Sequence, residues 1–235
     1  MRDDSRFHVL HVVSGDLWAG AEMQLLTLVR ALKTGKGATI TVVLMNRGRL
    51  EQELRALGVQ VVVIDEFCLN GLQITWRLIR CIRELQPDVV HTHRSKENIL
   101  GAFAAAVCGV PSMRTTHGAA EHAAPLYKLH KHMIRLLDWF AGRFVQRRVV
   151  AVSEELAGKL VRSFGAGRIV VIENGLDIDT LSPRIGRAIG SRKTIGIAGR
   201  LVRVKRVDLF LRIAKHLCEQ EPGLDMRFRV LGDGP

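Results

Sequence analysis

Two cations stand beside a glycine turn near the end of the chain. Gly199 follows the apolar run 194–198, and Arg200 and Lys205 precede an apolar pattern with helical spacing, 207–218. The start of a helix offers free backbone N–H groups and the positive end of the helix dipole. These features together favour an anion, most often a phosphate. The alternative, two cations solvated on a surface loop, stays open at this point.

A second glycine turn lies near the start of the chain. Gly20 ends the loop 14–20, which separates the buried-strand run 7–13 from a helical pattern over 21–32. A residue without a Cβ lets the backbone approach an anion at a helix start, although a plain tight turn would also use glycine. Glu22 falls in the first helical turn, where a carboxylate complements the dipole, so we assign it a structural role.

Three histidines lie at the carboxyl ends of predicted strands. His91 and His93 lie at the end of one strand, and alternation puts them on the same face, where we expect them to pack and to fix a loop. His117 lies just past the strand 112–116 and before Gly118. In a parallel sheet, ligands bind beyond the carboxyl ends of the strands, so this position favours a functional role for His117.

The composition limits the classes of protein that this chain can be. It has 235 residues, 47% of them hydrophobic, and a net charge of +12, which excludes wholesale disorder and makes a phosphate-bearing partner plausible. The four cysteines are scattered, which indicates neither a zinc site nor a disulfide framework. No targeting signal and no bilayer-spanning run is recognisable, so we expect a cytoplasmic protein.

The strands that must position these residues are uniformly apolar and alternate with helices. Such strands are buried on both faces, which predicts a parallel sheet in a doubly wound, Rossmann-like α/β domain. The predicted strands are 7–13, 38–45, 59–64, 88–91, 112–116, 148–152 and 168–172. The predicted helices are 21–32, 50–57, 73–85, 98–108, 126–144 and 154–164.

A second unit begins after a loose basic segment. We predict a first domain over 1–175, a linker over 176–192 and the start of a second domain over 193–235. The last part holds a strand, a helix and a strand. One such unit cannot cover a parallel sheet on both faces, so we expect the rest of that domain to lie outside this sequence.

Seven short motifs in order resemble those of family 4 retaining glycosyltransferases, which have the GT-B fold of two Rossmann-like domains. They run along nearly the whole chain. The motifs are Trp18-Ala19-Gly20-Ala21-Glu22, Asp88-Val89-Val90-His91-Thr92-His93, Arg114-Thr115-Thr116-His117-Gly118, Val150-Ala151-Val152-Ser153-Glu154, Ile172-Glu173-Asn174-Gly175-Leu176-Asp177, Gly199-Arg200-Leu201 with Lys205, and Leu231-Gly232-Asp233-Gly234-Pro235.

The resemblance implies roles for four residues. Gly20 would lie against the donor diphosphate, with Ala19 in place of the family's first glycine, and Arg200 and Lys205 would be the diphosphate cations. His117 would line the donor-sugar pocket as the catalytic residue of the site. Fixed cations at the leaving phosphate stabilise the transition state more than the ground state. The family mechanism implied is front-face transfer assisted by the leaving phosphate.

The resemblance also implies the substrates. A sugar would move from a nucleotide-diphosphate sugar to a polysaccharide or lipid-linked acceptor, without a further cofactor, in the cytoplasm and peripherally at the inner face of the cell membrane. The family's Glu-x7-Glu segment would follow Pro235, so we expect half of the donor site outside this sequence.

We predict no metal. The spacing of His117, Glu121 and His122 is one residue longer than the inverted zincin motif. Asp177-Ile178-Asp179 resembles the Asp-x-Asp metal motif of the other glycosyltransferase fold, but it follows Asn174-Gly175, which is typical of a hinge turn.

The segment Leu126–Arg148 combines an apolar stripe with a strongly cationic face. A basic amphipathic helix can lie on anionic lipid, whereas the simpler interpretation is a packed helix with a solvated cationic face. Two other functions stay open for the whole chain. One is a sugar-nucleotide epimerase of GT-B-like fold, and the other is a non-catalytic basic domain that binds a membrane or polyanion. Few aromatic residues, 5%, and no recognition-helix motif weigh against nucleic acid.

Overall fold

The computed structural model divides into two compact units, Met1–Asp177 and Ile178–Pro235. It describes residues 7–16, 18–35, 37–118, 129–178, 192–221, 223 and 225–234. Residues 179–191 of the predicted linker 176–192 lie outside the described part, so the predicted domain boundaries stay predictions.

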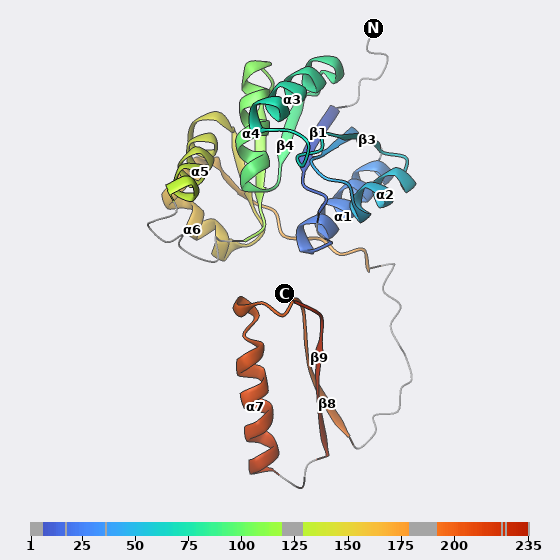
Figure 1. The fold of residues 1–235 in the computed structure, drawn as a ribbon, viewed down its shortest axis with the longest axis vertical. Coiled ribbons are helices and arrows are strands. Elements are labelled where there is room, and N and C mark those ends of the chain that lie inside the picture. Colours follow the sequence, from blue (N-terminus) through green and yellow to red (C-terminus); the bar gives the residue numbers. More distant parts are fainter. Residues whose placement is uncertain are drawn as a thin grey trace. The chain divides into compact units, whose positions relative to one another are not determined.

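The first unit is built on a seven-stranded parallel sheet with the order β3-β2-β1-β4-β5-β6-β7 (Figure 1). Its strands are β1 (Phe7–Val13), β2 (Ala38–Leu44), β3 (Gln60–Val63), β4 (Val89–Thr92), β5 (Ser112–Thr116), β6 (Arg148–Ala151) and β7 (Ile169–Val171). The α/β fold class that we predicted is confirmed. The order reverses between β1 and β4, and at such a switch point the carboxyl ends of the two strands flank a crevice.

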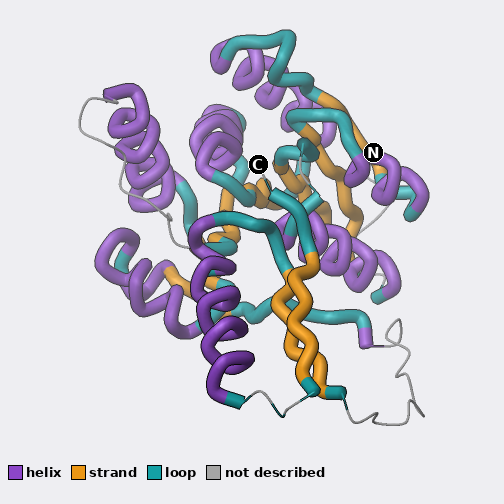
Figure 2. Tube along the Cα trace, turned by 60° about the horizontal axis from the view of Figure 1, so that its bottom comes forward, coloured by secondary structure: helices purple, strands orange, loops and turns teal. Residues whose placement is uncertain are grey.

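Helices cover both faces of this sheet (Figure 2). They are α1 (Gly20–Thr34), α2 (Arg49–Ala56), α3 (Gly71–Leu85), α4 (Ser95–Val107), α5 (Leu129–Phe140) and α6 (Glu154–Phe164). Successive residues of β1 point to opposite faces. On one face, Leu10 packs with Ile74 of α3 in a buried cluster. On the other face, Val13 packs with Leu25 of α1 in a second cluster. The same parity directs His11 to the α1 face.

Local sequence explains where α3 begins and ends. Asn70 Oδ1 accepts a hydrogen bond from the Gln73 backbone N–H at 3.0 Å, and Gln73 Oε1 accepts one from the Asn70 N–H at 2.9 Å. This capping box satisfies two N–H groups that have no partner within the helix. At the other end Gln86 takes a left-handed conformation, φ 46°, before Pro87, whose ring excludes a continuing helix.

Most of the helix predicted over 126–144 is described, as α5 and the turn that follows it. Residues 126–128 lie outside the described part, and α5 passes into a π-helical turn, Ala141–Val145. Arg114 of β5 is 2% exposed and anchors this region. Its guanidinium donates to Asp138 Oδ1 and to the Asp138 carbonyl, both at 2.9 Å, so a buried ion pair ties the end of α5 to the sheet.

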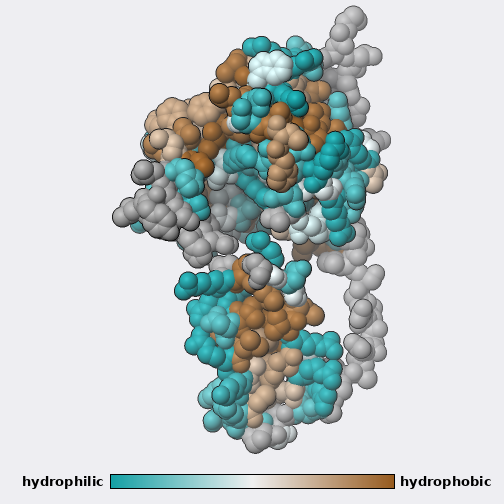
Figure 3. Space-filling view, in the orientation of Figure 1, coloured by the Kyte–Doolittle hydropathy of each residue, from teal (hydrophilic) through white to brown (hydrophobic). Residues whose placement is uncertain are grey.

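The second unit contains β8 (Lys193–Ala198), a 3-10 turn (Arg203–Lys205), α7 (Val207–Gln220) and β9 (Met226–Leu231). The two strands pair in parallel from Lys193 with Met226 to Ala198 with Leu231. Apolar side chains remain uncovered on this unit, such as Leu211 (55% exposed) and Leu231 (58%), and Figure 3 shows them gathered beside α7. A single strand-helix-strand unit lacks the partners that would bury this surface.

No helix in the described part of the chain has both the length and the apolar character that crossing a bilayer requires.

Candidate functional site

Four histidines gather at the switch point of the sheet. His11 of β1 is the register partner of His91 of β4, and His93 follows two residues later on the same face. His117 comes directly after β5, the next strand. The neighbouring ring centroids lie 4.9 Å apart for His11 and His91, 4.5 Å for His91 and His93, and 5.6 Å for His93 and His117. The imidazoles therefore form one stacked cluster.

Hydrogen bonds link these rings to one another. His11 Nδ1 lies 3.1 Å from His93 Nε2, and His93 Nδ1 lies 3.3 Å from His117 Nε2. His91 Nε2 bonds instead to Thr115 Oγ1 of β5, at 2.7 Å. The predicted common face of His91 and His93 is confirmed, and both contribute to the cluster in addition to packing.

Burial keeps the cluster uncharged. Loss of solvation lowers the pKa of His11 from 6.5 to about 4. Burial, followed by repulsion from neighbouring imidazoles, lowers the pKa of His91 and of His93 well below the usual value. Burial and the nearby Arg94 guanidinium also lower the pKa of His117, which is half-buried. At neutral pH each ring thus carries a single N–H.

A cavity of about 310 Å³ opens against this cluster. His91, His93 and His117 form its polar side, while α1 and the strands β5 and β6 supply apolar side chains. The other lining residues are Gln24, Leu25, Thr27, Leu28, Ala31, Met113, Thr115, Val150, Val152, Ile172, Glu173, Asn174 and Gly175. A mainly apolar cavity with a few convergent polar groups is typical of small-ligand sites.

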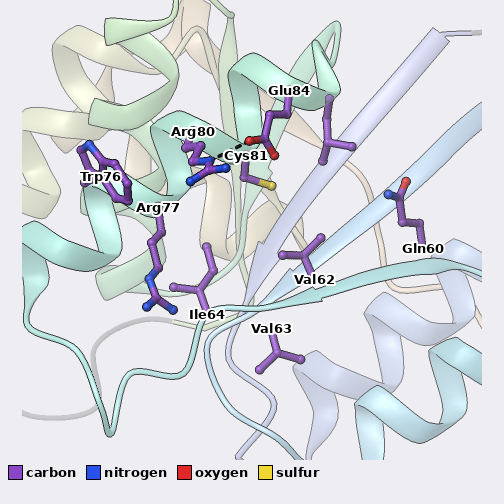
Figure 4. Close-up of a pocket in the computed structure, with 10 residues that line it drawn as sticks. Gln60, Val62, Val63, Ile64, Trp76, Arg77, Arg80, Cys81 and Glu84 are labelled. Atoms are coloured by element: carbon purple, nitrogen blue, oxygen red, sulfur yellow. Dashed lines mark hydrogen bonds and ion pairs between the residues drawn. The ribbon is translucent and has the colours of Figure 1, made fainter.

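A larger groove, about 440 Å³, lies at the β3 edge of the sheet, between β3 and α3 (Figure 4). Arg80 there already pairs with Glu84 at 2.7 Å. Cys81 is an inert thiol, since burial raises its pKa to about 11. The groove lies beside the edge strand β3 and not at the switch point between β1 and β4, and its polar groups do not converge, so we do not assign it the functional site.

Helix α1 begins at the carboxyl ends of the strands, where the histidine cluster also lies, and it has no side-chain cap. Its first intrahelical backbone bond runs from the Met23 N–H to the Ala19 carbonyl, 3.0 Å, so the N–H groups of residues 20–22 have no backbone acceptor within the helix. Ala19 has φ −133°, extended backbone that an alanine adopts without strain. A Cβ on Gly20 would meet nothing within 4 Å, so the fold does not itself require this glycine and its surface is open to a ligand.

Glu22 and Arg94 fix the start of α1. Glu22 is fully buried and its Oε2 accepts a hydrogen bond from the Ala19 N–H at 3.2 Å, which agrees with the structural role that we predicted. Its other oxygen pairs with Arg94, which also contacts Asp16 Oδ1 at 3.1 Å. Arg94 thus brings a cation to the loop before Gly20.

The loop after β1 is held by close backbone packing. A Cβ on Gly48 would lie 2.2 Å from the Gly15 carbonyl oxygen, and one on Gly15 would lie 2.7 Å from that of Asn46. Ser14 Oγ donates to the buried carboxylate of Glu97 in the first turn of α4. These contacts hold the loop that leads to Gly20 against its neighbours.

In the second unit, two glycine loops run side by side. The Gly199 N–H donates to the Leu231 carbonyl at 2.9 Å, and the Leu201 N–H donates to the Asp233 carbonyl at 2.7 Å. Gly199 has φ +146°, and a Cβ on Gly232 would lie 2.0 Å from the Gly199 oxygen. Both positions therefore require glycine.

Arg200 and Lys205 are exposed on this pair of loops. Within the part of the chain that the structure describes, neither side chain forms an ion pair, whereas Arg206 next to them is paired with Asp208 at 3.2 Å. Two cations without an acidic partner beside a tight backbone turn can bind an anion.

The predicted site residues thus fall into two groups. His117 and Gly20 lie at the carboxyl edge of the first sheet, and Arg200 and Lys205 lie together at the carboxyl edge of the second. Glu121, His122 and Asp179, which we weighed as metal ligands, lie outside the described part. Asp177 pairs with Arg30 of α1 at 3.8 Å.

Sequence reasoning missed His11 and Arg94. His11 sits inside an apolar run, and only the pairing of β1 with β4 reveals its histidine neighbours. Arg94 follows the strand-end histidines directly. Its positive charge and its place just after a strand were the features of the sequence that could have identified it as a residue of the site.

The glycosyltransferase family 4 model matches residues 18–180, more than half of the chain. The chain belongs to glycosyltransferase family 4. This confirms the resemblance inferred from the motifs, and the matched region includes Gly20 and the histidine cluster except His11.

Curated relatives are glycosyltransferases. The chain is 28% identical over 196 residues to the UDP-Gal:alpha-D-GlcNAc-diphosphoundecaprenol alpha-1,3-galactosyltransferase of Escherichia coli, covering 79% of this chain and 50% of that protein. It is 26% identical over 250 residues to the putative glycosyltransferase EpsF of Bacillus subtilis, covering 99% and 64%. The chain therefore spans about half to somewhat under two thirds of these relatives.

Solved structures share the fold. Anabaena Alr3699/HepE in complex with UDP aligns with a TM-score of 0.69 at 17% identity, covering 97% of this chain and 69% of that one. A putative UDP-N-acetylglucosamine 2-epimerase from Listeria monocytogenes aligns with a TM-score of 0.60 at 15% identity, covering 96% and 62%. The GT-B fold that we predicted is confirmed.

The buried histidines predict an acid-sensitive first unit. Between pH 6.5 and 4 the unfolded chain binds protons that buried His11 does not, so the free energy of unfolding falls as the pH falls, by up to about 1.4 kcal/mol per pH unit for each such histidine. Urea unfolding followed by tryptophan fluorescence measures this, because Trp18, Trp76 and Trp139 all lie in the first unit. His11→Leu should flatten the slope, and the exposed His216→Asn should not. An unchanged slope in His11→Leu would contradict the assignment.

Proposed function

We propose that this chain supplies the acceptor-side domain and the donor-phosphate loop of a retaining, metal-independent glycosyltransferase. It transfers a sugar from a nucleotide-diphosphate sugar to a polysaccharide or lipid-linked acceptor. The observation that carries the proposal is the histidine-lined cavity at the switch point of a family 4 sheet. In an open parallel sheet, the carboxyl ends of the strands at this point are where ligands bind.

The cavity suits the sugar of the donor. Neutral imidazoles donate and accept hydrogen bonds without imposing a charge, which fits hydroxyl groups, and the apolar walls fit the C–H face of a pyranose. His117 is the group that would touch the sugar. The open N-terminus of α1 at Gly20 would lie against the diphosphate.

The loops of the second unit suit the leaving diphosphate. As the bond from the anomeric carbon to the phosphate oxygen breaks, the electron pair stays with that oxygen and positive charge develops on the sugar. Arg200 and Lys205 would stabilise the growing negative charge, and this interaction is stronger in the transition state than in the ground state. We place the reaction in the cytoplasm, because the proposed donor is a nucleotide sugar.

Anabaena HepE was solved in complex with UDP, and the relative from Escherichia coli is a UDP-Gal transferase by name, so UDP is the first nucleotide to test. One solved protein with this fold is the putative UDP-N-acetylglucosamine 2-epimerase from Listeria monocytogenes. An epimerase would return an epimerised free donor, whereas a transferase would move the labelled sugar to an acceptor. The family match favours the transferase.

The donor-phosphate proposal is tested by titrating the chain with UDP and with pyrophosphate in a calorimeter. We expect Arg200→Gln and Lys205→Gln each to weaken binding about three- to tenfold, because each removes one charge-assisted hydrogen bond from an exposed site. The matched control is Lys215→Gln, an exposed lysine of α7 in the same unit. Equal affinities in all four proteins, or no saturable binding by the wild type, would end the assignment of these two residues.

We further propose that α5 contacts the anionic inner face of the membrane. In the described part of the chain its apolar stripe is largely exposed, with Met133 57%, Leu136 55% and Phe140 41% exposed. Figure 3 shows apolar side chains on the surface of the first unit in this region. Lys131, Arg135 and Arg143 are interspersed with these apolar residues. Apolar area combined with cationic charge is what binds an amphipathic helix to anionic lipid.

Vesicle co-sedimentation tests this contact. The wild type should bind vesicles containing phosphatidylglycerol, and bind phosphatidylcholine vesicles less. Leu136→Ser should reduce binding several-fold, because it removes apolar area that would enter the interface. Leu72→Ser of α3 removes an equally large side chain that is 84% exposed, and should change nothing. Should both variants bind like the wild type, α5 is not the contact surface.

A further inference from the structure

His117 is the last member of a row of three hydrogen-bonded imidazoles. His11 Nδ1 lies 3.1 Å from His93 Nε2, and His93 Nδ1 lies 3.3 Å from His117 Nε2. Each ring is neutral at pH 7, so it has one N–H to donate and one lone pair to accept with. The row can therefore run in two directions. Either His11 donates to His93, which donates to His117, or each bond is reversed.

The buried end of the row decides the direction. His11 is 1% exposed, and its Nε2 has no hydrogen-bond partner in the described part of the chain. If the row ran from His117 to His11, His11 Nδ1 would accept and its proton would sit on Nε2, as a buried N–H without an acceptor. Orphaned buried N–H groups are rarer than unpaired acceptor lone pairs. The opposite direction leaves only a lone pair at Nε2.

We propose that His11 and His93 are positioning residues that hold His117 as its Nδ1–H tautomer. His11 Nδ1–H donates to His93 Nε2, and His93 Nδ1–H donates to His117 Nε2. The proton of His117 is thereby held at Nδ1, the nitrogen that does not face His93. The proposal deepens the proposed function, on which its substrate rests: His117 offers a hydrogen-bond donor, suited to a hydroxyl or carbonyl oxygen of the donor sugar.

A metal ion is the competing use of these rings. His11, His91 and His93 are a group of three possible ligands whose donor atoms lie within 4.8 Å of one another. A tetrahedral zinc ion with Zn–N bonds near 2.0–2.1 Å brings its nitrogens to roughly 3.3 Å from each other. His11 and His93 are already hydrogen-bonded to each other at that range, and His91 Nε2 is hydrogen-bonded to Thr115 Oγ1. The rings therefore fit a hydrogen-bonded row better than a metal site.

Nitrogen-15 NMR of the histidine rings tests the row on the free protein, without any donor. A neutral histidine in water favours the Nε2–H tautomer, so three linked Nδ1–H rings would be a distinctive result. We expect protonated Nδ1 and unprotonated Nε2 in His11, His93 and His117 of the chain at pH 7.5. Protonated Nε2 in His117 would overturn the proposal. So would a stoichiometric metal whose removal by EDTA moves these resonances.

Two variants of His93 separate positioning from packing. His93→Asn places an amide N–H near the position of Nδ1, so it should keep His117 as Nδ1–H. His93→Leu removes the donor, and His117 should change to a majority of Nε2–H. His216→Asn on the exposed face of α7 should leave the His117 signals unchanged.

If His117 keeps Nδ1–H in His93→Leu, His93 does not position it. Should His93→Leu fail to fold, the wild-type spectrum and His93→Asn still decide the matter. Failure of UDP to bind would leave these spectra unaffected, so the two proposals fail separately.

Discussion

The pairing of β1 with β4 is the constraint on which the first unit's site depends. It places His11 opposite His91 at the point where the strand order reverses, and pleat alternation brings His93 to the same face. Three imidazoles enclosed here must stay neutral, since charging any one costs its solvation. A neutral imidazole has one hydrogen-bond donor and one acceptor. His93 can therefore set which nitrogen of His117 carries the proton at the cavity.

Parts of this arrangement could be predicted from the sequence because they depend on local pattern. Apolar runs located all seven strands of the sheet, and the two-residue spacing of His91 and His93 predicted their common face. Helix α6 begins at Glu154 as predicted, whereas α3 begins at Gly71, two residues before the predicted start, because Asn70 caps it together with Gln73. The seven motifs predicted the family that the family model then confirmed.

Other parts depend on contacts between distant segments. His11 belongs to the histidine cluster only because β1 pairs with β4 and places it beside His91, 80 residues away in the sequence. Arg94 lies near the start of α1 because it pairs with Glu22. Backbone conformation was equally inaccessible: Ala19 replaces the family glycine in an extended conformation that needs none. The stripe of α5 shows a helical period whether it is packed or exposed, so the pattern could not distinguish the two. Gly20, His117, Arg200 and Lys205 remain predicted site residues.

We propose above all that the donor sugar lies against His117, beside the buried histidines. The most direct measurement is the response of the His117 ring resonances to a panel of UDP-hexoses, compared with UDP alone. We predict that at least one UDP-hexose shifts the His117 signals at concentrations where UDP leaves them nearly unchanged. A UDP-hexose that binds the chain but leaves His117 unmoved, or that acts on it no differently from UDP, would contradict the account.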